Sequence, residues 1–159
     1  MGGEIKINSK KKVNNELIAD LKIEQKKRLS STTLESTQVP LQVDEIPILS
    51  IAASFASGIS VFKGLKELTV KESNRLLLIH ENLKKIGVKS KIKNYDLYIY
   101  GDNNLKKGGA IIKHNDDHRI LMSFVIANII CKKNNIIKDK SCVKTSYPMF
   151  FKHASQLIN

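Results

Sequence analysis

Several residue types are scarce in this sequence of 159 residues, and each scarcity narrows the range of functions. There is no tryptophan, and aromatic residues make up only 6% of the chain, which is little for a surface that stacks on nucleic-acid bases. The only cysteines are Cys131 and Cys142, and their separation is not that of a metal-binding pair. These observations argue against a disulfide framework and against a cysteine-based metal site.

Long apolar runs are also missing. The two most apolar segments, 46–62 and 120–131, are too short or too often interrupted by proline, serine and glycine to cross a membrane. The first six residues contain no apolar signal core, so nothing in them indicates export. We therefore expect a soluble, cytoplasmic protein with no membrane partner.

Arginine is the third scarce residue type. Of the 27 basic residues only Arg28, Arg75 and Arg119 are arginines, so lysine supplies the other 24 and most of the net charge of +12. That charge first suggests a polyanion such as RNA. In a lysine-rich background, however, an arginine marks a position where lysine does not suffice, because its planar fork can hold a carboxylate or phosphate through two hydrogen bonds. Arg75 and Arg119 are therefore better candidates for a specific anion site than any single lysine.

Hydrophobic residues make up 42% of the chain, enough for a buried core, which indicates one domain or a large part of one. Apolar spacing and turn residues predict mixed strands and helices, an α/β (α+β) fold. Strands are expected at 4–8, 19–24, 59–62, 88–92, 97–100, 110–113 and 136–138, with a polar loop at 10–15 and a hairpin turn at Asn94. Helices are expected at 46–56, 71–86, 117–131 and 147–158, with Gly87 as a C-terminal cap.

The second half of the chain repeats the plan of the first. Asp44-Glu45 before Ile48-Leu49 is echoed by Asp116-Asp117 before Ile120-Leu121, and the run 70–73 is echoed by 143–146, at spacings of 72 to 73 positions. A shared spacing at two places indicates a duplicated supersecondary unit. Because helix N-termini attract anions, two such units packed together would gather several anion-binding termini around one cleft.

The run Lys71-Glu72-Ser73-Asn74-Arg75 is expected to open a helix, with Lys71 and Arg75 on one face. Two ordinary explanations exist for Glu72. It can form a surface salt bridge with Arg75, or it can complete a capping box with Thr69. The repeat and the rare arginine favour a functional role over both.

Asp117, His118 and Arg119 directly precede the most apolar predicted helix. Asp117 is a candidate N-cap, which leaves Arg119 in the first turn, where an anion would bind. His114 and His118 are four residues apart, but no glutamate stands in the general-base position of a zinc helix, so we expect no metal.

Asp44 and Glu45 precede the other apolar helix. An N-cap carboxylate is the ordinary explanation for one of them, and a general base held near the anion site is the functional one. Lys144 occupies the position of Lys71 in its own unit, although alone it would be one lysine among many.

Four runs in this order resemble the C-terminal portion of the 5-enolpyruvylshikimate-3-phosphate synthase family. They are VDEIPIL at 43–49, VKESNR at 70–75, DHRILMSF at 117–124 and KTSYP at 144–148. The opening residues 1–5 and 19–21 also resemble the strand pair that precedes this region in the family. Order and spacing agree over nearly the whole chain, so the resemblance is specific.

The resemblance implies the enolpyruvyl transferase fold, in which each of two globular domains contains three βαβαββ units and the active site lies between the domains. This chain would be a partial C-terminal domain. Residues 1–43 would hold the closing strands of a preceding unit and a connector, 44–101 a first unit and 108–159 a second. The N-terminal domain would be absent, and we expect the chain to be inactive without it.

The resemblance also implies a reaction. The family transfers the carboxyvinyl group of phosphoenolpyruvate to the 5-hydroxyl of shikimate 3-phosphate and releases phosphate, through a tetrahedral intermediate and without a cofactor. Asp44 would accept the hydroxyl proton and contact shikimate 3-phosphate, Glu72 would exchange the proton at the methylene carbon, and Lys71 would bridge both substrates. Arg75, Arg119 and Lys144 would hold phosphoenolpyruvate, with Asp117 and His118 in support.

Two positions depart from the family pattern, which usually has aspartate at Asn74 and arginine at Thr69. The loss of two charges beside Lys71 and Glu72 affects the local electrostatics. Two other functions compete with the transferase. A basic α/β module for nucleic acid predicts binding that weakens steeply with salt, and a structural domain would use these residues only as helix caps. The arginine argument favours the transferase, with no nucleic-acid partner.

Overall fold

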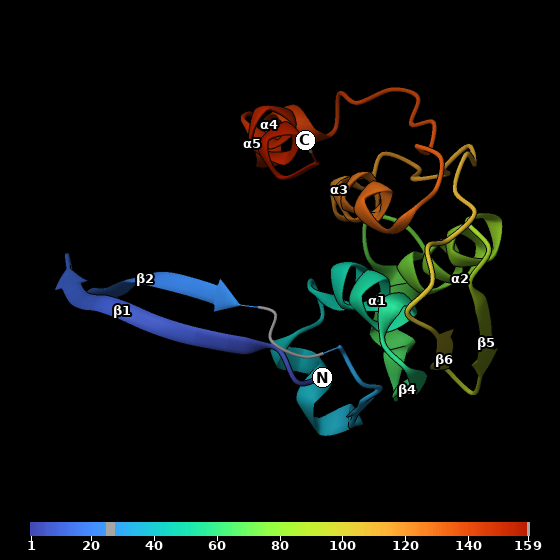
Figure 1. Ribbon diagram of the computed structural model, residues 1–159, viewed down its shortest axis with the longest axis horizontal. Helices are drawn as coiled ribbons and strands as arrows, with labels where there is room; N and C mark the ends of the chain where they lie inside the picture. Colours follow the sequence, from blue (N-terminus) through green and yellow to red (C-terminus); the bar gives the residue numbers. More distant parts are fainter. Residues whose placement is uncertain (25–27, 159) are drawn as a thin grey trace.

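The computed structural model describes residues 1–24 and 28–158 (Figure 1). Its strands are β1 (Glu4–Val13), β2 (Glu16–Glu24), β3 (Thr33–Leu34), β4 (Gly58–Phe62), β5 (Lys89–Lys93) and β6 (Asp96–Gly101). Its α-helices are α1 (Ile46–Phe55), α2 (Arg75–Lys85), α3 (His118–Ile126), α4 (Val143–Ser146) and α5 (Phe150–Ile158). Three 3-10 helices complete the fold: η1 (Ser36–Leu41), η2 (Leu65–Val70) and η3 (Ala127–Ile130). No helix within these residues has the length and apolar character needed to cross a membrane.

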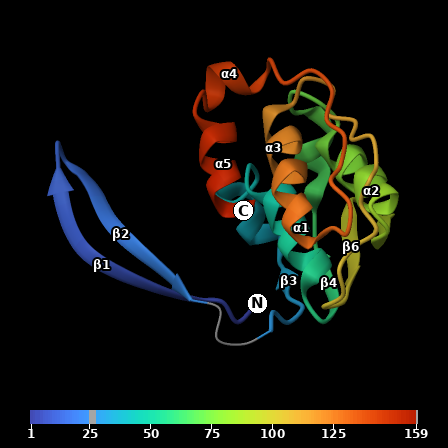
Figure 2. The ribbon, with the colours of Figure 1, turned by 45° about the horizontal axis from the view of Figure 1, so that its top comes forward.

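β1 and β2 form an antiparallel hairpin that extends away from the rest of the chain (Figures 1 and 2). The two expected strands are confirmed, but the expected loop at 10–15 is mostly wrong, because β1 continues to Val13. The turn contains only Asn14 and Asn15, whose φ angles of 47° and 69° suit a two-residue hairpin turn. The hairpin contributes no residue to the buried cores of the described chain.

The main sheet has the strand order β3-β4-β6-β5. β3 runs parallel to β4, and β6 pairs antiparallel with both of its neighbours. With α1 and α2 inserted between the strands, the order from β3 to β6 is β-α-β-α-β-β. The expected α/β architecture is confirmed. The division into units at 44–101 and 108–159 stays a prediction, and β3 lies before the first of them.

The main core lies between this sheet and the helices. α1 packs on β6, α2 packs on β5, and α3 packs on α1. Fully buried side chains from every layer meet there, including Ile46, Phe62, Leu65, Ile79, Leu83, Leu97, Ile99, Ile120 and Phe124. Gly101 allows the closest approach of helix and sheet, since a Cβ at this position would lie 2.2 Å from the carbonyl oxygens of Ala53 and Ala56. The packing of α1, α2 and α3 on this core brings the N-termini of these three helices to one side of it.

The predicted helix at 71–86 begins four residues late. Val70 ends η2, Lys71 is extended, and Asn74 is the N-cap of α2, with its side chain accepting a hydrogen bond from the Leu77 amide at 3.0 Å. The expected capping box of Thr69 and Glu72 is therefore wrong, because the helix has not yet begun there. The C-terminal end is as predicted. Gly87, at φ 91°, ends the helix in a Schellman arrangement, with its N–H bonded to the Lys84 carbonyl and the next N–H bonded to the Leu83 carbonyl.

The predicted hairpin after α2 is confirmed as β5 and β6. Its turn contains Asn94 and Tyr95, with φ angles of 51° and 65°, which is the two-residue type I′ geometry.

The region after β6 departs most from expectation. The strands predicted at 110–113 and 136–138 are wrong, because the two segments meet only at the parallel bridge between Ile111 and Ile136. The predicted helix at 117–131 is split into α3 and η3, although Asp117 is confirmed as the N-cap, accepting from the backbone N–H groups of Arg119 and Ile120 at 3.0 and 3.3 Å.

The last predicted helix, at 147–158, begins at Phe150 instead. Tyr147 precedes Pro148, and a residue before proline is disfavoured in helical conformation. Its φ and ψ of −149° and 78° agree with that restriction. α5 and the short α4 pack on α3 around a second, smaller core.

Candidate active site

Three segments that are far apart in the sequence bring charged residues together where α1, α2 and α3 begin. Asp44 lies two residues before α1, Arg75 is the first residue of α2, and Asp117 and Arg119 begin α3. These are positions that the sequence singled out, and the packing of the three helices on one core places them within contact distance.

Arg75 is at the centre of this cluster. Its side chain is 0% exposed, and each guanidinium nitrogen donates to a different carboxylate. Nε lies 2.8 Å from Asp117 Oδ2, Nη1 lies 2.7 Å from Asp44 Oδ1, and Nη2 is paired with Glu72. Burial opposes the charge, but the hydrogen bonds to Asp117 and Asp44 outweigh it and raise the pKa of Arg75. A buried cation with this many partners is a fixed part of the fold.

Asp117 is the carboxylate that fixes Arg75 in place. It is also 0% exposed, and its Oδ2 accepts from Ser73 Oγ at 2.9 Å as well as from Arg75. Its other oxygen caps α3, as described above. One carboxylate thus connects the Lys-Glu-Ser run, the start of α2 and the start of α3. Ser73 belongs to the Lys-Glu-Ser motif, and the sequence alone indicates no role for it.

Asp44 contacts both arginines at once. Its Oδ2 lies 3.2 Å from Arg119 Nη2, and its backbone carbonyl accepts from Arg119 Nη1 at 3.2 Å, while Oδ1 is bound to Arg75. The N-cap explanation fails here, because Glu45 occupies that position and its side chain makes no capping hydrogen bond. Burial alone would raise the pKa of Asp44, but the hydrogen bond from Arg75 and the charges of Arg119, Arg75 and Lys71 lower it below its usual value.

The remaining predicted residues are less tightly held. Lys71 Nζ lies 2.5 Å from Glu67 Oε1, and the positive charge of Lys71 also contributes to lowering the pKa of Asp44. His118 is half-buried at the start of α3. Lys144 is exposed in α4 and forms no ion pair with the cluster among the described residues. The structure therefore brings together Asp44, Glu72, Arg75, Asp117 and Arg119, places Lys71 beside them, and leaves Lys144 apart.

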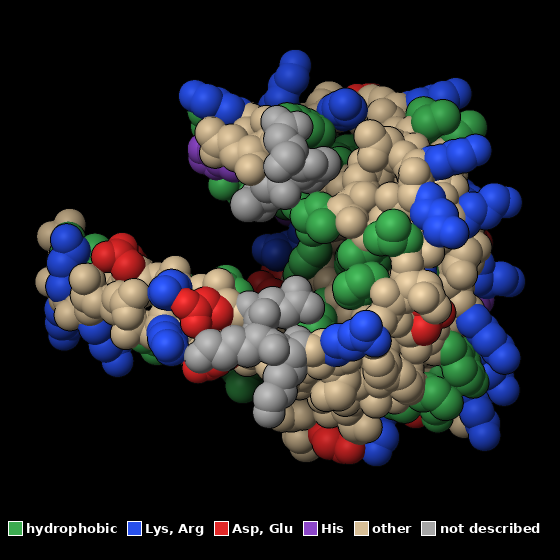
Figure 3. Space-filling model, viewed as in Figure 1, with side chains coloured by type: hydrophobic (Ala, Val, Ile, Leu, Met, Phe, Trp, Pro, Cys, Tyr) green, Lys and Arg blue, Asp and Glu red, His purple; other side chains and the backbone are tan. Residues whose placement is uncertain are grey.

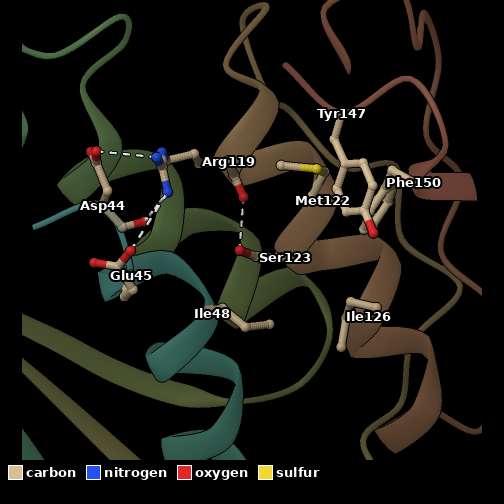
Figure 4. Close-up of a pocket in the computed structure, with 9 residues that line it drawn as sticks. All are labelled: Asp44, Glu45, Ile48, Arg119, Met122, Ser123, Ile126, Tyr147 and Phe150. Carbon is tan, nitrogen blue, oxygen red and sulfur yellow. Dashed lines mark hydrogen bonds and ion pairs between the residues drawn. The ribbon is translucent and has the colours of Figure 1, made fainter. Parts of the chain in front are cut away.

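A pocket of about 310 Å³ opens beside Arg119 (Figure 4). Its charged end is formed by Asp44, Glu45 and Arg119, and its other end by apolar side chains from α1, α3 and the C-terminal segment, namely Ile48, Met122, Ile126, Tyr147 and Phe150. Sequence reasoning missed this apolar end. No local pattern indicates it, because these residues become neighbours only when the C-terminal segment folds back on α3.

One of the two histidines that are four residues apart has a backbone partner. His114 is buried, and its Nε2 donates to the Lys138 carbonyl at 2.9 Å. Over residues 1–24 and 28–158 no three His, Cys, Asp or Glu side chains are grouped in a way that could hold a metal ion.

Both departures from the family pattern have local explanations. Asn74 serves as the N-cap of α2, a position for which asparagine and aspartate are equally suited. The Thr69 hydroxyl donates to the Lys66 carbonyl at 2.7 Å and closes the last turn of η2. The described hydrogen bonds of both side chains go to backbone atoms outside the charged cluster.

Basic side chains outside the site are visible on several parts of the surface. On the face seen in Figure 3 they are distributed over the hairpin, the top and the right edge of the body. This distribution agrees with the lysine-rich composition of the chain.

Comparisons with known proteins agree with the motifs. The family profile described as EPSP synthase (3-phosphoshikimate 1-carboxyvinyltransferase) matches residues 1–153. The chain is 35% identical over 99% of its length to the 3-phosphoshikimate 1-carboxyvinyltransferase of Aquifex aeolicus, and 38% identical over 96% to that of Thermoanaerobacter sp.. A solved structure of EPSP synthase from Acinetobacter baumannii superposes with a TM-score of 0.90 at 34% identity, over 98% of this chain and 36% of that one. The chain spans about a third of the length of these relatives, 36% and 35% for the two sequences.

Proposed function

This chain belongs to the EPSP synthase family, and on that premise we propose that it provides the C-terminal part of the active site of a 3-phosphoshikimate 1-carboxyvinyltransferase. The reaction proposed is the transfer of the carboxyvinyl group of phosphoenolpyruvate to the 5-hydroxyl of shikimate 3-phosphate, with release of phosphate, in aromatic amino-acid biosynthesis. Because the chain spans about a third of its relatives, the remaining contacts to both substrates would come from polypeptide outside it. A cytoplasmic location is part of the same proposal.

One observation carries the proposal. Two arginines and three carboxylates from separate motifs converge at the starts of three helices, beside a pocket. An addition–elimination reaction between two anionic substrates needs these groups. It needs cations to hold the phosphate and carboxylates, one group to take the hydroxyl proton, and one to deliver a proton to the methylene carbon.

The proton-transfer roles are assigned to the acidic side chains and to Lys71. Asp44 is the acceptor for the 5-hydroxyl proton, since it is ionised at neutral pH and lies at the charged end of the pocket. Glu72 exchanges the proton at the methylene carbon, and its side chain is 53% exposed and so can be reached by a ligand. Lys71 neighbours both and bridges the two substrates.

The binding roles are assigned to the basic side chains. Arg119 is 35% exposed and lines the pocket, so it holds the phosphate or carboxylate of phosphoenolpyruvate directly. Arg75 lies behind Asp44 and reaches a bound anion once that carboxylate moves. Lys144 is also assigned to phosphoenolpyruvate, although it lies apart from the cluster in α4, and Asp117 and His118 are assigned supporting roles.

The test supplies the rest of the enzyme. The chain would be joined to the N-terminal two thirds of the Aquifex aeolicus relative, and phosphate release from phosphoenolpyruvate would be measured with and without shikimate 3-phosphate. We expect release only when both are present, and we expect Lys71→Ala or Glu72→Gln to lower kcat by at least about a hundredfold, a typical contribution of general acid–base catalysis.

Lys66→Ala and Glu81→Gln are matched controls. They make the same charge changes in η2 and α2, outside the cluster, and should leave the rate within about twofold. Full activity in both Lys71→Ala and Glu72→Gln would refute the assignment. The 159-residue chain by itself is expected to show no turnover.

A further inference from the structure

The anion-binding groups of this site are already occupied by the chain itself. All three guanidinium nitrogens of Arg75 donate to carboxylates, and Arg119 forms an ion pair with the Asp44 carboxylate and donates to the Asp44 carbonyl. The Asp44 carboxylate spans the two arginines, one oxygen on each, as a bound carboxylate or phosphate would.

The carboxylates around Arg75 are not equivalent. Asp117 is 0% exposed and is tied to Ser73 and to the backbone of α3, so it cannot leave without disrupting the fold. Asp44 and Glu72 are 41% and 53% exposed. Apart from the arginines, no described hydrogen bond holds either carboxylate. These two can move into solvent while Asp117 keeps Arg75 in position.

The charge balance makes this movement necessary for anion binding. Three carboxylates contact the two guanidinium groups closely and a fourth, that of Glu45, lies 3.9 Å from Arg119, so the cluster offers an incoming anion no unneutralised arginine. A phosphate placed beside Asp44 and Glu72 would be repelled by both of them. Once either carboxylate leaves, the guanidinium donors it held become free.

We propose that the site is self-occupied in the ligand-free state, with Asp44 and Glu72 holding the place of the anionic substrate on Arg75 and Arg119 until the substrate displaces them. The proposal rests on the proposed function, in which these arginines bind phosphoenolpyruvate. Displacement then has a consequence for catalysis. The same exchange that seats the anion releases the two carboxylates that transfer protons, so they are freed only when a substrate is in place.

The pKa of Asp44 agrees with this order of events. In the ligand-free state burial raises the pKa of Asp44, but the two arginines lower it by more, so the Asp44 carboxylate is a weak base. When the arginines turn to a bound anion, that lowering effect is diminished and the carboxylate becomes a better proton acceptor.

The proposal makes a prediction that runs against the usual effect of removing active-site residues. In the 159-residue chain, Asp44→Asn and Glu72→Gln should each bind inorganic phosphate about five- to tenfold more tightly than the unsubstituted chain, because the internal competitor loses its charge. Titration calorimetry at 0.15 M salt measures this, and at that ionic strength long-range charge effects are screened.

Glu81→Gln is the matched control. It removes one negative charge from α2, the helix that Arg75 begins, but Glu81 forms no ion pair with either arginine among the described residues. We expect its phosphate affinity to change by less than about twofold. Thermal unfolding of each variant checks that the fold is retained, and the exposed Glu72→Gln keeps the test available if Asp44→Asn is unstable.

The outcomes separate the two proposals. Tighter phosphate binding by both variants, with the affinity of Glu81→Gln unchanged, supports displacement. Unchanged or weaker binding by both variants, or no phosphate binding by any chain, overturns it. The proposed function is judged separately by the joined enzyme, where failure to release phosphate would refute the function whatever the affinities are.

Discussion

The two halves of the chain share a sequence pattern but differ in structure. Residues 33–101 form a four-stranded sheet with two helices on a large core, whereas residues 106–158 contain three helices, one 3-10 helix and only isolated bridges in place of strands. The first echo holds, since α1 and α3 begin 72 residues apart, at Ile46 and His118. The second does not, because 70–73 contains the last residue of η2 and the segment before α2, while its counterpart 143–146 is the helix α4.

The difference follows from the strands that are available as partners. β4 and β6 each have two neighbours, so their backbone groups are paired on both sides. The segments around Ile111 and Ile136 have the apolar residues of strands, but among the described residues they have only each other, and two short strands without further partners are marginally stable. A repeated pattern therefore yields a repeated structure only where the repeated partners are present.

The candidate active site lies where the two halves meet. Asp44, Glu72 and Arg75 come from the first half, and Asp117 and Arg119 come from the second. Their contacts make the position of α3 relative to α2 a condition for the site. A substitution that destabilises one half should therefore have effects on stability and hydrogen exchange that differ from those of a substitution at the contact between the halves.

The largest effect is expected at the contact itself. Asp117→Asn keeps an oxygen for the helix cap but removes the buried charge that faces Arg75, and should lower the free energy of unfolding by about 3–5 kcal/mol in urea denaturation. Asp116→Asn is the control, since Asp116 is exposed and asparagine tolerates its φ of 58°. Equal stabilities of the two variants would show that the halves are not held together by this ion pair.

Shortening a buried side chain in each core should show how much each half contributes to the stability of the chain. Leu83 and Leu121 are both 0% exposed, but Leu83 belongs to the main core and Leu121 to the small core around α4 and α5. Leu83→Ala should destabilise the whole chain by about 2–5 kcal/mol, while Leu121→Ala should cost less because its surroundings can collapse into the space.

Hydrogen exchange followed by mass spectrometry gives the regional readout for this pair. Leu121→Ala should speed exchange mainly in residues 143–156, and Leu83→Ala should speed it throughout 46–101. Faster exchange in both regions for both variants would mean that the two halves unfold as one unit.

The smallest effect is expected from acid. Since the folded-state pKa of Asp44 is lowered, its ionised form stabilises the fold above its unfolded value of 3.8, and this contribution is lost as the pH falls from there through the lower folded value. Asp44→Asn should flatten that part of a stability–pH curve, with Glu45→Gln as the control. The effect is modest because the side chain is 41% exposed and solvent screens it. A variant curve that still falls as steeply as the unsubstituted one would assign the acid sensitivity to other carboxylates.

Much of the fold was readable from the sequence because it depends on local rules. The apolar run at 46–56, the cap at Gly87 and the Asn94 turn each rely on residues that are near neighbours in the chain, and all are confirmed. The errors were of two kinds. The sequence predicts that α2 starts at Lys71, but the helix starts at Arg75, because the Asn74 side chain provides the N-cap. The strands at 110–113 and 136–138 failed because their partners are not local.

The candidate site shows the same division. The scarcity of arginine identified Arg75 and Arg119, and motif order identified Asp44, Glu72 and Asp117, before any contact was known. The roles assigned to these residues stay predictions. Their pairing was not readable, because Asp44 and Arg119 are 75 residues apart and the ion pair depends on how α1 and α3 pack.

The sequence by itself thus determined which residue types stand at the helix starts and which family the chain resembles, since both depend on order along the chain. Only the tertiary structure decided that Arg75 is buried against three carboxylates, that Asp44 spans both arginines, and that apolar side chains complete the pocket. The physical reason is that charge neutralisation and burial depend on distances between segments, and those distances are set by packing around the core.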